Sequence, residues 1–140
     1  MLPLRLVLDT NIIVSAILKP DGLQRTVFLL SITRPARLYV TASILEEYKS
    51  VLRRKEFEIR KGLRLQFLDT LKRHARIPSP STTLKVTSDP DDNKFIECAD
   101  EAGADYLITG NQRHFPSYWK KTKVINSRDF VTLVSPHLGL

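Results

Sequence analysis

Residues 89–111 read DPDDNKFIECADEAGADYLITGN and decide the class of fold. Asp89 suits the N-cap of a helix, Pro90 suits its first position and Gly103 suits its end, because each residue type is favoured at that place. A short apolar strand, residues 106–109, follows at once. A well-marked helix that leads directly into a buried strand predicts an α/β fold.

The alternation of strands and helices continues outward from this stretch. Strands are expected at residues 4–8, 37–40 and 123–126, and an extended segment at residues 85–87. Helices are expected at residues 43–54, 62–75 and 128–134, the last with Ser127 as its N-cap, and from Asp21 or Gly22 to about residue 32. Residues 11–18 are expected to form a short helical or irregular turn. This order predicts a mostly parallel sheet with helices on both faces. In such folds the functional crevice lies at the carboxyl ends of the strands.

Length and composition favour one domain over residues 1–140, with a hydrophobic share of 42% that is enough for a packed core. No stretch approaches the roughly 20 apolar residues of a membrane helix, and the N-terminus has no recognisable secretory signal. The single cysteine, Cys98, cannot form an internal disulfide and is expected in the core. We therefore expect a cytoplasmic protein with no membrane association.

Basic residues outnumber acidic residues by 22 to 15, which gives a net charge of +7. They recur in short groups at residues 53–55, 60–61, 72–73 and 120–123. Such an excess attracts polyanions such as nucleic acids. A solvated basic surface would have the same composition, so charge alone leaves both interpretations open.

Polar side chains are expected at the carboxyl ends of several strands. Asp9 ends an apolar strand, and Thr41, Thr109 and Asn111 fall at or just beyond the ends of two others. The ends of parallel strands meet at one edge of a sheet, so these side chains indicate a site there. Asp9 has a structural alternative, because an aspartate in this place also caps the next helix.

Two adjacent glutamates differ in the direction that their helix gives them. At about 100° per residue, Glu46 points nearly opposite the apolar face, while Glu47 lies on its flank. With Ser43 as the N-cap, Glu46 would complete a capping box. Glu47 would then be either a plain surface residue or a residue that overlooks the crevice.

Asp91 and Asp92 occupy the first turn of the helix that Asp89 opens, and spacing does not choose between them. Both acids could simply complement the helix dipole. Gathered at one crevice, such carboxylates would repel each other and raise each other's pKa, a cost that a divalent cation removes. Oxygen ligands suit Mg²⁺ or Mn²⁺, and these ions activate water at a phosphodiester.

Three motifs in this order, LVLDTNIIVSAIL, TASILEEYKSVLRR and DPDDNKFIECADEAGADYLITGN, closely resemble those of PIN domains, in particular the toxin type of prokaryotic toxin–antitoxin systems. The resemblance covers roughly residues 4–130. It implies a three-layer α/β/α sandwich and a Mg²⁺- or Mn²⁺-dependent endoribonuclease. It further implies an RNA substrate, an antitoxin as protein partner and a homodimer as the assembly.

The resemblance also implies the residues of the site. It assigns the catalytic, metal-binding acids to Asp9, Glu47 and Asp92, and the supporting roles to Asn11, Ser43 and Thr109. Many PIN domains have an aspartate where this chain has Asn111, which weakens the case for a second tightly bound metal ion. Asn111 remains a candidate ligand through its amide oxygen, and Asp91 is a supporting residue that would compensate for the lost charge. Arg113 and His114 follow Asn111 and are candidates for contact with RNA.

Other classes of protein fit the sequence less well. A haloacid-dehalogenase-type phosphatase needs an aspartate at the place of Asn11, and a response-regulator receiver needs strand-end aspartate and lysine residues that are not evident. The serious alternative is a PIN-like protein of little or no catalytic activity that binds RNA or an antitoxin. Asn111 is the feature that favours this alternative.

Overall fold

A single five-stranded sheet runs through the computed structural model, which describes residues 4–79, 87 and 89–138. The strands are β1 (Arg5–Leu8), β2 (Arg37–Leu38), β3 (Tyr106–Ile108), β4 (Tyr118–Trp119) and β5 (Thr122–Ile125), in the order β2-β1-β3-β5-β4. The first four strands of that order are parallel, and β4 pairs antiparallel with β5 at the edge. The predicted mostly parallel sheet is therefore confirmed.

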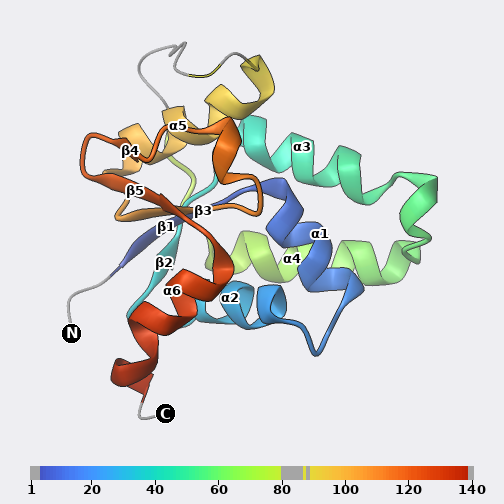
Figure 1. Ribbon diagram of the computed structural model, residues 1–140. Helices are drawn as coiled ribbons and strands as arrows, with labels where there is room; N and C mark the ends of the chain where they lie inside the picture. Colours follow the sequence, from blue (N-terminus) through green and yellow to red (C-terminus); the bar gives the residue numbers. More distant parts are fainter. Residues whose placement is uncertain (1–3, 80–86, 88, 139–140) are drawn as a thin grey trace.

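Helices cover both faces of this sheet. They are α1 (Thr10–Leu18), α2 (Leu23–Ser31), α3 (Ala42–Leu52), α4 (Lys61–His74), α5 (Pro90–Ala102) and α6 (Ser127–Val134), with 3₁₀ turns η1 (Lys55–Phe57), η2 (Gln112–His114) and η3 (Ser135–Leu138). Figure 1 shows α5 on one side of the strands and α2 with α6 on the other. This is the expected three-layer α/β/α arrangement, and α1 packs against both α2 and α3.

The centre of the sheet is apolar on both faces. Leu6, Val7 and Leu8 of β1 are fully buried, as are Leu107 and Ile108 of β3. A continuous run of buried residues is typical of a parallel strand that has helices above and below it. Consecutive residues of β1 thus anchor opposite helical layers, and Asp9 is held at a fixed place where β1 ends.

Two predicted helix caps are wrong. Thr41, and not Ser43, caps α3: its backbone is extended, and its hydroxyl accepts the Ile44 N–H at 3.2 Å. Ser43 therefore lies inside the first turn, and Glu46 pairs with Lys49 in place of a capping box. Asn126, not Ser127, caps α6 and accepts the Asp129 N–H at 2.8 Å.

The ambiguous and unpredicted segments have simple outcomes. Residues 11–18 are helical, within α1, and Gly22 is the N-cap of α2. Strand β4 was not predicted; it contains only two residues and is ordered by its pairing with β5. Of the extended segment expected at residues 85–87, residues 85 and 86 lie outside the described residues.

Candidate active site

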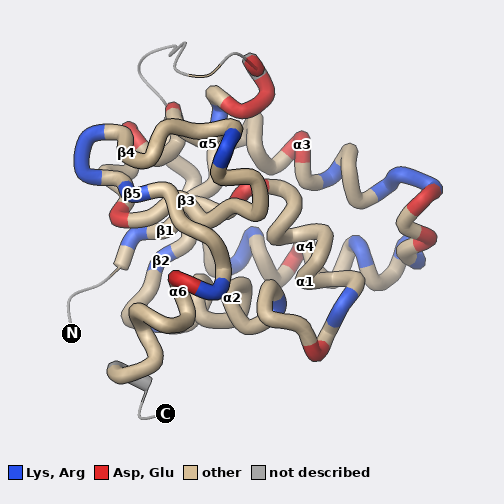
Figure 2. Tube along the Cα trace, in the orientation of Figure 1, with Lys and Arg blue, Asp and Glu red and all other residues tan. Residues whose placement is uncertain are grey.

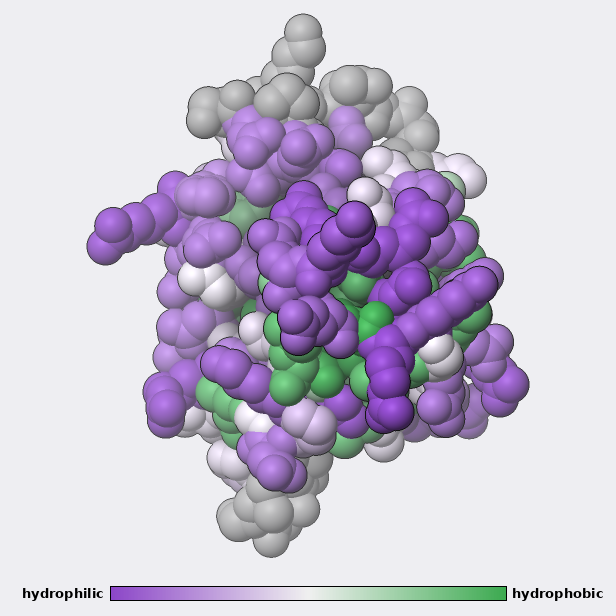
Figure 3. All heavy atoms as spheres, turned by 90° about the vertical axis from the view of Figure 1, so that its right-hand side faces the viewer, coloured by the Kyte–Doolittle hydropathy of each residue, from purple (hydrophilic) through white to green (hydrophobic). Residues whose placement is uncertain are grey.

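A cavity of about 860 Å³ opens where α1, α3, α5 and the loop after β3 meet at the carboxyl edge of the sheet. Among the described residues that line it, the carboxylates are Asp9, Glu46, Glu47, Asp89, Asp91 and Asp92. Lys94 and Arg54 are its cationic lining residues, beside His114. Figure 3 looks at the side toward which α1, α3 and α4 extend, and hydrophilic residues there surround a small hydrophobic area.

Asp9 is the most deeply placed of these acids, with 7% of its surface exposed. It caps α1, and its Oδ1 accepts the Thr10 N–H at 2.7 Å. Its Oδ2 accepts the Thr109 hydroxyl at 2.7 Å and the Asn11 amide at 3.4 Å. Burial raises the pKa of Asp9, while the hydrogen bonds from Thr109 and Thr10 oppose that rise, and Glu47 adds a smaller repulsion. Asp9 is therefore both a helix cap and a desolvated acid in the cavity.

Glu47 reaches the cavity from the second turn of α3. Its side chain is 19% exposed, whereas that of Glu46 is 74% exposed, so the helix separates the two as its geometry predicts. The Thr10 hydroxyl donates to Oε2 of Glu47, and the Lys94 ammonium lies 2.9 Å from Oε1. Both carboxylate oxygens of Glu47 are thus engaged by groups of α1 and α5.

The two acids at the start of α5 have different surroundings. The side chain of Asp92 is 15% exposed and that of Asp91 is 80% exposed. Asp92 Oδ2 lies 3.5 Å from His114 Nδ1. Burial, then repulsion from Asp89 and Asp9, raises the pKa of Asp92, and His114 lowers it. The structure therefore turns Asp92 inward and leaves Asp91 at the solvent-facing rim.

The loop after β3 closes the cavity next to Asp9. Thr109 is fully buried, and its hydroxyl accepts the Asn111 N–H at 2.9 Å while it donates to Asp9. The Asn11 amide oxygen accepts the Gly110 N–H at 3.1 Å. Asn111 itself is exposed on the cavity wall. Thr109 and Asn11 thus tie the loop to the first acid.

Other residues expected at the site lie on its border. Ser43 lines the cavity from an exposed position in α3, and no hydrogen bond joins it to Asp9 in the described part of the chain. Arg113 and His114 line a neighbouring hollow of about 510 Å³ in the loop after β3. His114 belongs to both spaces, so it links the acidic cavity to this basic border.

The predicted acids share one cavity without forming a closed ligand cage. Among the residues described, no three His, Cys, Asp or Glu side chains are grouped closely enough to hold one metal ion. Asp9 and Asp92 repel each other, while the oxygens of Glu47 face Thr10 and Lys94. Mg²⁺ is commonly held by one or two carboxylates while it keeps several waters. The carboxylates of Asp9 and Asp92 could therefore hold a hydrated divalent ion.

Thr10, Lys94 and Arg54 were not predicted from the sequence as members of the site. Thr10 directly follows Asp9 in the sequence. Lys94 is the third residue after Asp91, and this spacing places Lys94 and Asp91 on the same side of a helix. That spacing indicates a pair within α5 but does not indicate that Lys94 crosses to Glu47 of α3. The meeting of α3 and α5 depends on the tertiary fold.

Comparison with known families identifies this arrangement. The PIN-domain family model matches residues 5–113. The chain belongs to the PIN-domain family. The resemblance of the three motifs is thereby confirmed, and PIN domains are generally nucleases that typically use divalent metal ions.

Two further proteins are similar to this PIN domain. The uncharacterized protein MJ1680 of Methanocaldococcus jannaschii is 30% identical over 112 residues, which cover 78% of this chain and 72% of that protein. The crystal structure of VapBC2 from Rickettsia felis bound to a DNA fragment from their promoter matches with a TM-score of 0.59 and 19% identity, over 88% of this chain and 98% of that chain. The second likeness concerns the fold alone. None of the helices in the described part of this PIN domain has the length and apolar character needed to cross a membrane.

Proposed function

We propose that this PIN domain is a Mg²⁺- or Mn²⁺-dependent endoribonuclease and the toxin of a toxin–antitoxin pair. The observation that carries the proposal is the pair of inward-facing acids, Asp9 and Asp92, whose pKa values are both raised at one cavity. Among the described residues, no lysine or arginine forms an ion pair with either carboxylate. Desolvated carboxylates that no described lysine or arginine neutralises favour an added cation.

The chain's own groups would divide the work of cleavage. The Thr109 hydroxyl and the Thr10 N–H hold the Asp9 carboxylate in one orientation, and Asp92 faces it from the start of α5. When bound to these acids, a divalent ion supplies the positive charge that polarises a phosphodiester and lowers the pKa of water. Arg54, exposed on the cavity wall, would hold a phosphate of the RNA strand.

The biological setting is part of the same proposal. An antitoxin partner and a homodimer are what the PIN-toxin resemblance implies, and the likeness to VapBC2 supports the antitoxin partner alone. The proposed location is the cytoplasm, because RNA is present there and because its reducing conditions suit a protein whose single thiol, Cys98, is free and buried. Asp9, Glu47 and Asp92 remain the proposed acids of the site, with Asn11 and Thr109 as the residues that position Asp9.

The test is cleavage of single-stranded and structured RNAs in Mn²⁺, in Mg²⁺ and in EDTA. We expect wild-type protein to cleave only with metal, and Asp9→Asn to lose about 100-fold or more of that rate, because the substitution removes a charged ligand. Asp69→Asn is the matched control, since Asp69 is an exposed residue of α4 that pairs with Arg73. Equal cleavage in EDTA would refute the metal requirement.

A second function is favoured by one observation, the uncharged Asn111 on the cavity wall. In that case the protein binds RNA or an antitoxin and cleaves little. Folded wild-type protein that binds RNA but does not cleave it with either metal would support this function. Cleavage gained by Asn111→Asp would then identify the missing carboxylate as the cause.

A further inference from the structure

The ion pair between Lys94 and Glu47 differs from the other ion pairs of the described residues. Lys94 Nζ lies 2.9 Å from Glu47 Oε1, and the two side chains are 17% and 19% exposed. In every other ion pair that joins two described residues, at least one side chain is 36% exposed or more. The Lys94–Glu47 pair is therefore a shielded interaction, in which the loss of the ammonium leaves the Glu47 carboxylate largely desolvated and without its ion-pair partner.

The pair also joins two elements at the cavity. Glu47 lies on α3, Lys94 lies on α5 two residues after Asp92, and both line the same space as Asp9. Figure 2 marks acidic positions at the start of α5 and along α3, close to this meeting point. Lys94 Nζ also lies 3.8 Å from Asp91 Oδ1. One ammonium thus stands between carboxylates of two helices.

An ammonium at this place performs part of the task of a metal ion. It neutralises Glu47 and reduces the repulsion between this carboxylate and Asp9. It differs from a metal ion in that it cannot ligate water or lower the pKa of water. A lysine is attached to the fold, so it holds its position at any concentration of free metal. Asn111, which also lines the cavity, provides no further charge.

We propose that Lys94 is a built-in cation that occupies the place of a second divalent ion at Glu47, so that the domain binds one divalent ion, at Asp9 and Asp92. Lys94 is in this view a positioning residue, because it acts through Glu47. The inference rests on the proposed metal-dependent function and specifies its metal content. It predicts that removal of the ammonium turns Glu47 into a ligand.

The test counts bound Mn²⁺ by isothermal titration calorimetry, with free Mn²⁺ measured by electron paramagnetic resonance. We expect one Mn²⁺ per chain for wild type, two for Lys94→Met and one again for the double variant Lys94→Met/Glu47→Gln. Lys49→Met is the matched control, because Lys49 pairs with Glu46 in an exposed position on the same helix as Glu47. The Lys49→Met variant should still bind one Mn²⁺ ion per chain. Circular dichroism and a thermal melt verify that each variant is folded.

The outcomes separate this inference from the proposed function. Two ions in wild type, or a single ion in folded Lys94→Met, would overturn the role of Lys94 and leave the nuclease proposal standing. No bound Mn²⁺ in wild type would overturn the metal-dependent function itself. If Lys94→Met does not fold, Lys94→Gln provides the same loss of charge with a polar side chain. The number of Mn²⁺ ions bound per chain of that variant then tests the role of Lys94 in the same way.

Discussion

At the scale of single residues, opposing effects act on the ionisation of the buried Asp9. Burial raises its pKa, and the hydrogen bonds from the Thr109 hydroxyl and the Thr10 N–H act against that rise. Only the carboxylate form binds a cation well, because the protonated form has no charge. The hydroxyl of Thr109 therefore lowers the pH at which the carboxylate form of Asp9 becomes available.

Thr109→Val removes this hydroxyl with little change of shape. Without its hydrogen bond the pKa of Asp9 rises further, so the carboxyl stays protonated to a higher pH. We expect the midpoint of Mn²⁺ binding against pH to move upward by about one pH unit, since a hydrogen bond to a charged group contributes about 1.5 kcal/mol. The measurement is Mn²⁺ affinity as a function of pH, from the acid range to neutrality. Thr132→Val, at an exposed position of α6, should keep the wild-type midpoint; a shared midpoint in all three proteins would contradict the role of Thr109.

The residues of the site could be predicted from the sequence only in part. Strand-end position indicated Asp9, and the motif resemblance chose Asp92 over Asp91, which matches their burial in the structure. The partners of Glu47 could not be predicted, because Thr10 and Lys94 reach it from other elements. Contacts between distant elements depend on how the elements pack, which local patterns do not encode.

At the scale of elements, α5 is the helix that the sequence predicts most fully, because both of its ends are marked. Asp89 accepts the Asp91 N–H at 2.9 Å, and Gly103 ends the helix with a positive φ of 60°. A side chain on Gly103 would find ordinary space, since the nearest atom is Lys121 Cε at 3.6 Å. The need for glycine is therefore one of backbone conformation.

Gly103→Ala tests this helix end. We expect it to lower the free energy of unfolding by about 1 kcal/mol, because an L-residue pays that much for the left-handed conformation. Gly62→Ala is the contrasting variant: Gly62 lies in α4 with nothing within 4 Å of an added Cβ. It should raise stability by about 0.5 kcal/mol, since alanine favours a helix. Urea unfolding measures both, and a Gly103→Ala protein as stable as wild type would show that the helix end tolerates alanine.

The errors at this scale have a common origin in competing local signals. Thr41 and Ser43 are both good N-cap residues, and the structure uses the earlier one. Asn126 precedes Ser127 in the same way at α6. Strand β4 is too short for a period of two to be visible, and Trp119 is instead fixed by its hydrogen bond to Asp100 at 3.0 Å. Neighbouring caps and two-residue strands are decided by tertiary contacts.

At the scale of the whole molecule, the signs of charge are separated. The chain has a net charge of +7, yet most of the charged residues that line its cavity are carboxylates. Figure 2 shows basic positions gathered at the end of α3 and in the loop between β4 and β5. Composition left open whether the basic excess binds polyanions or is a solvated surface, and only the fold gathers the carboxylates at one cavity. An RNA strand would be attracted over long range and then meet the acids through the bound metal.

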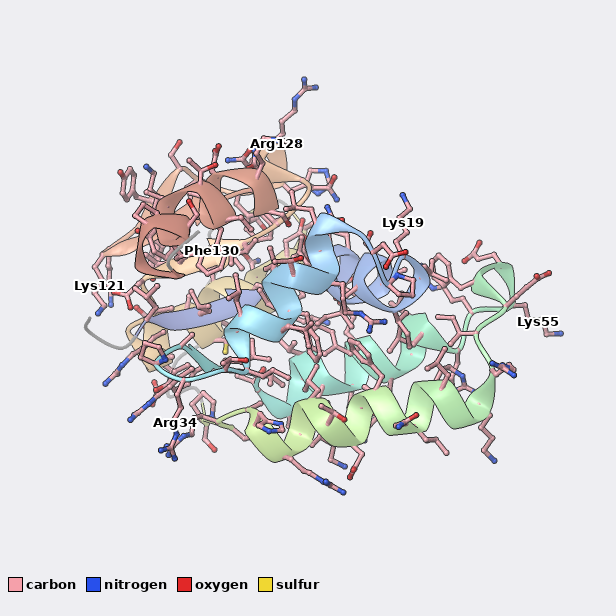
Figure 4. The ribbon with its side chains drawn as sticks, turned by 90° about the horizontal axis from the view of Figure 1, so that it is seen from below. Lys19, Arg34, Lys55, Lys121, Arg128 and Phe130 are labelled. Carbon is pink, nitrogen blue, oxygen red and sulfur yellow. The ribbon has the colours of Figure 1, made fainter. Side chains whose placement is uncertain are left out.

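This separation predicts that RNA affinity depends on salt in a manner specific to position. Each phosphate neutralised on a single strand releases counterions and contributes about −0.7 to the slope of log K against log salt concentration. Arg54 lines the cavity, whereas Arg34 precedes β2 at the opposite, amino edge of the sheet. Figure 4 shows Arg34 and Lys55, the neighbour of Arg54, at opposite ends of the molecule.

We expect Arg54→Gln to reduce the slope by about 0.7, and Arg34→Gln to leave it nearly unchanged. The measurement is fluorescence anisotropy of a single-stranded RNA between roughly 50 and 200 mM KCl, in the Asp9→Asn background so that the RNA is not cleaved. Both variants remove one positive charge, so a purely global attraction would change the two slopes equally. A larger effect at Arg54 instead requires a phosphate bound at the cavity wall, which places the RNA backbone beside Asp9 and Asp92.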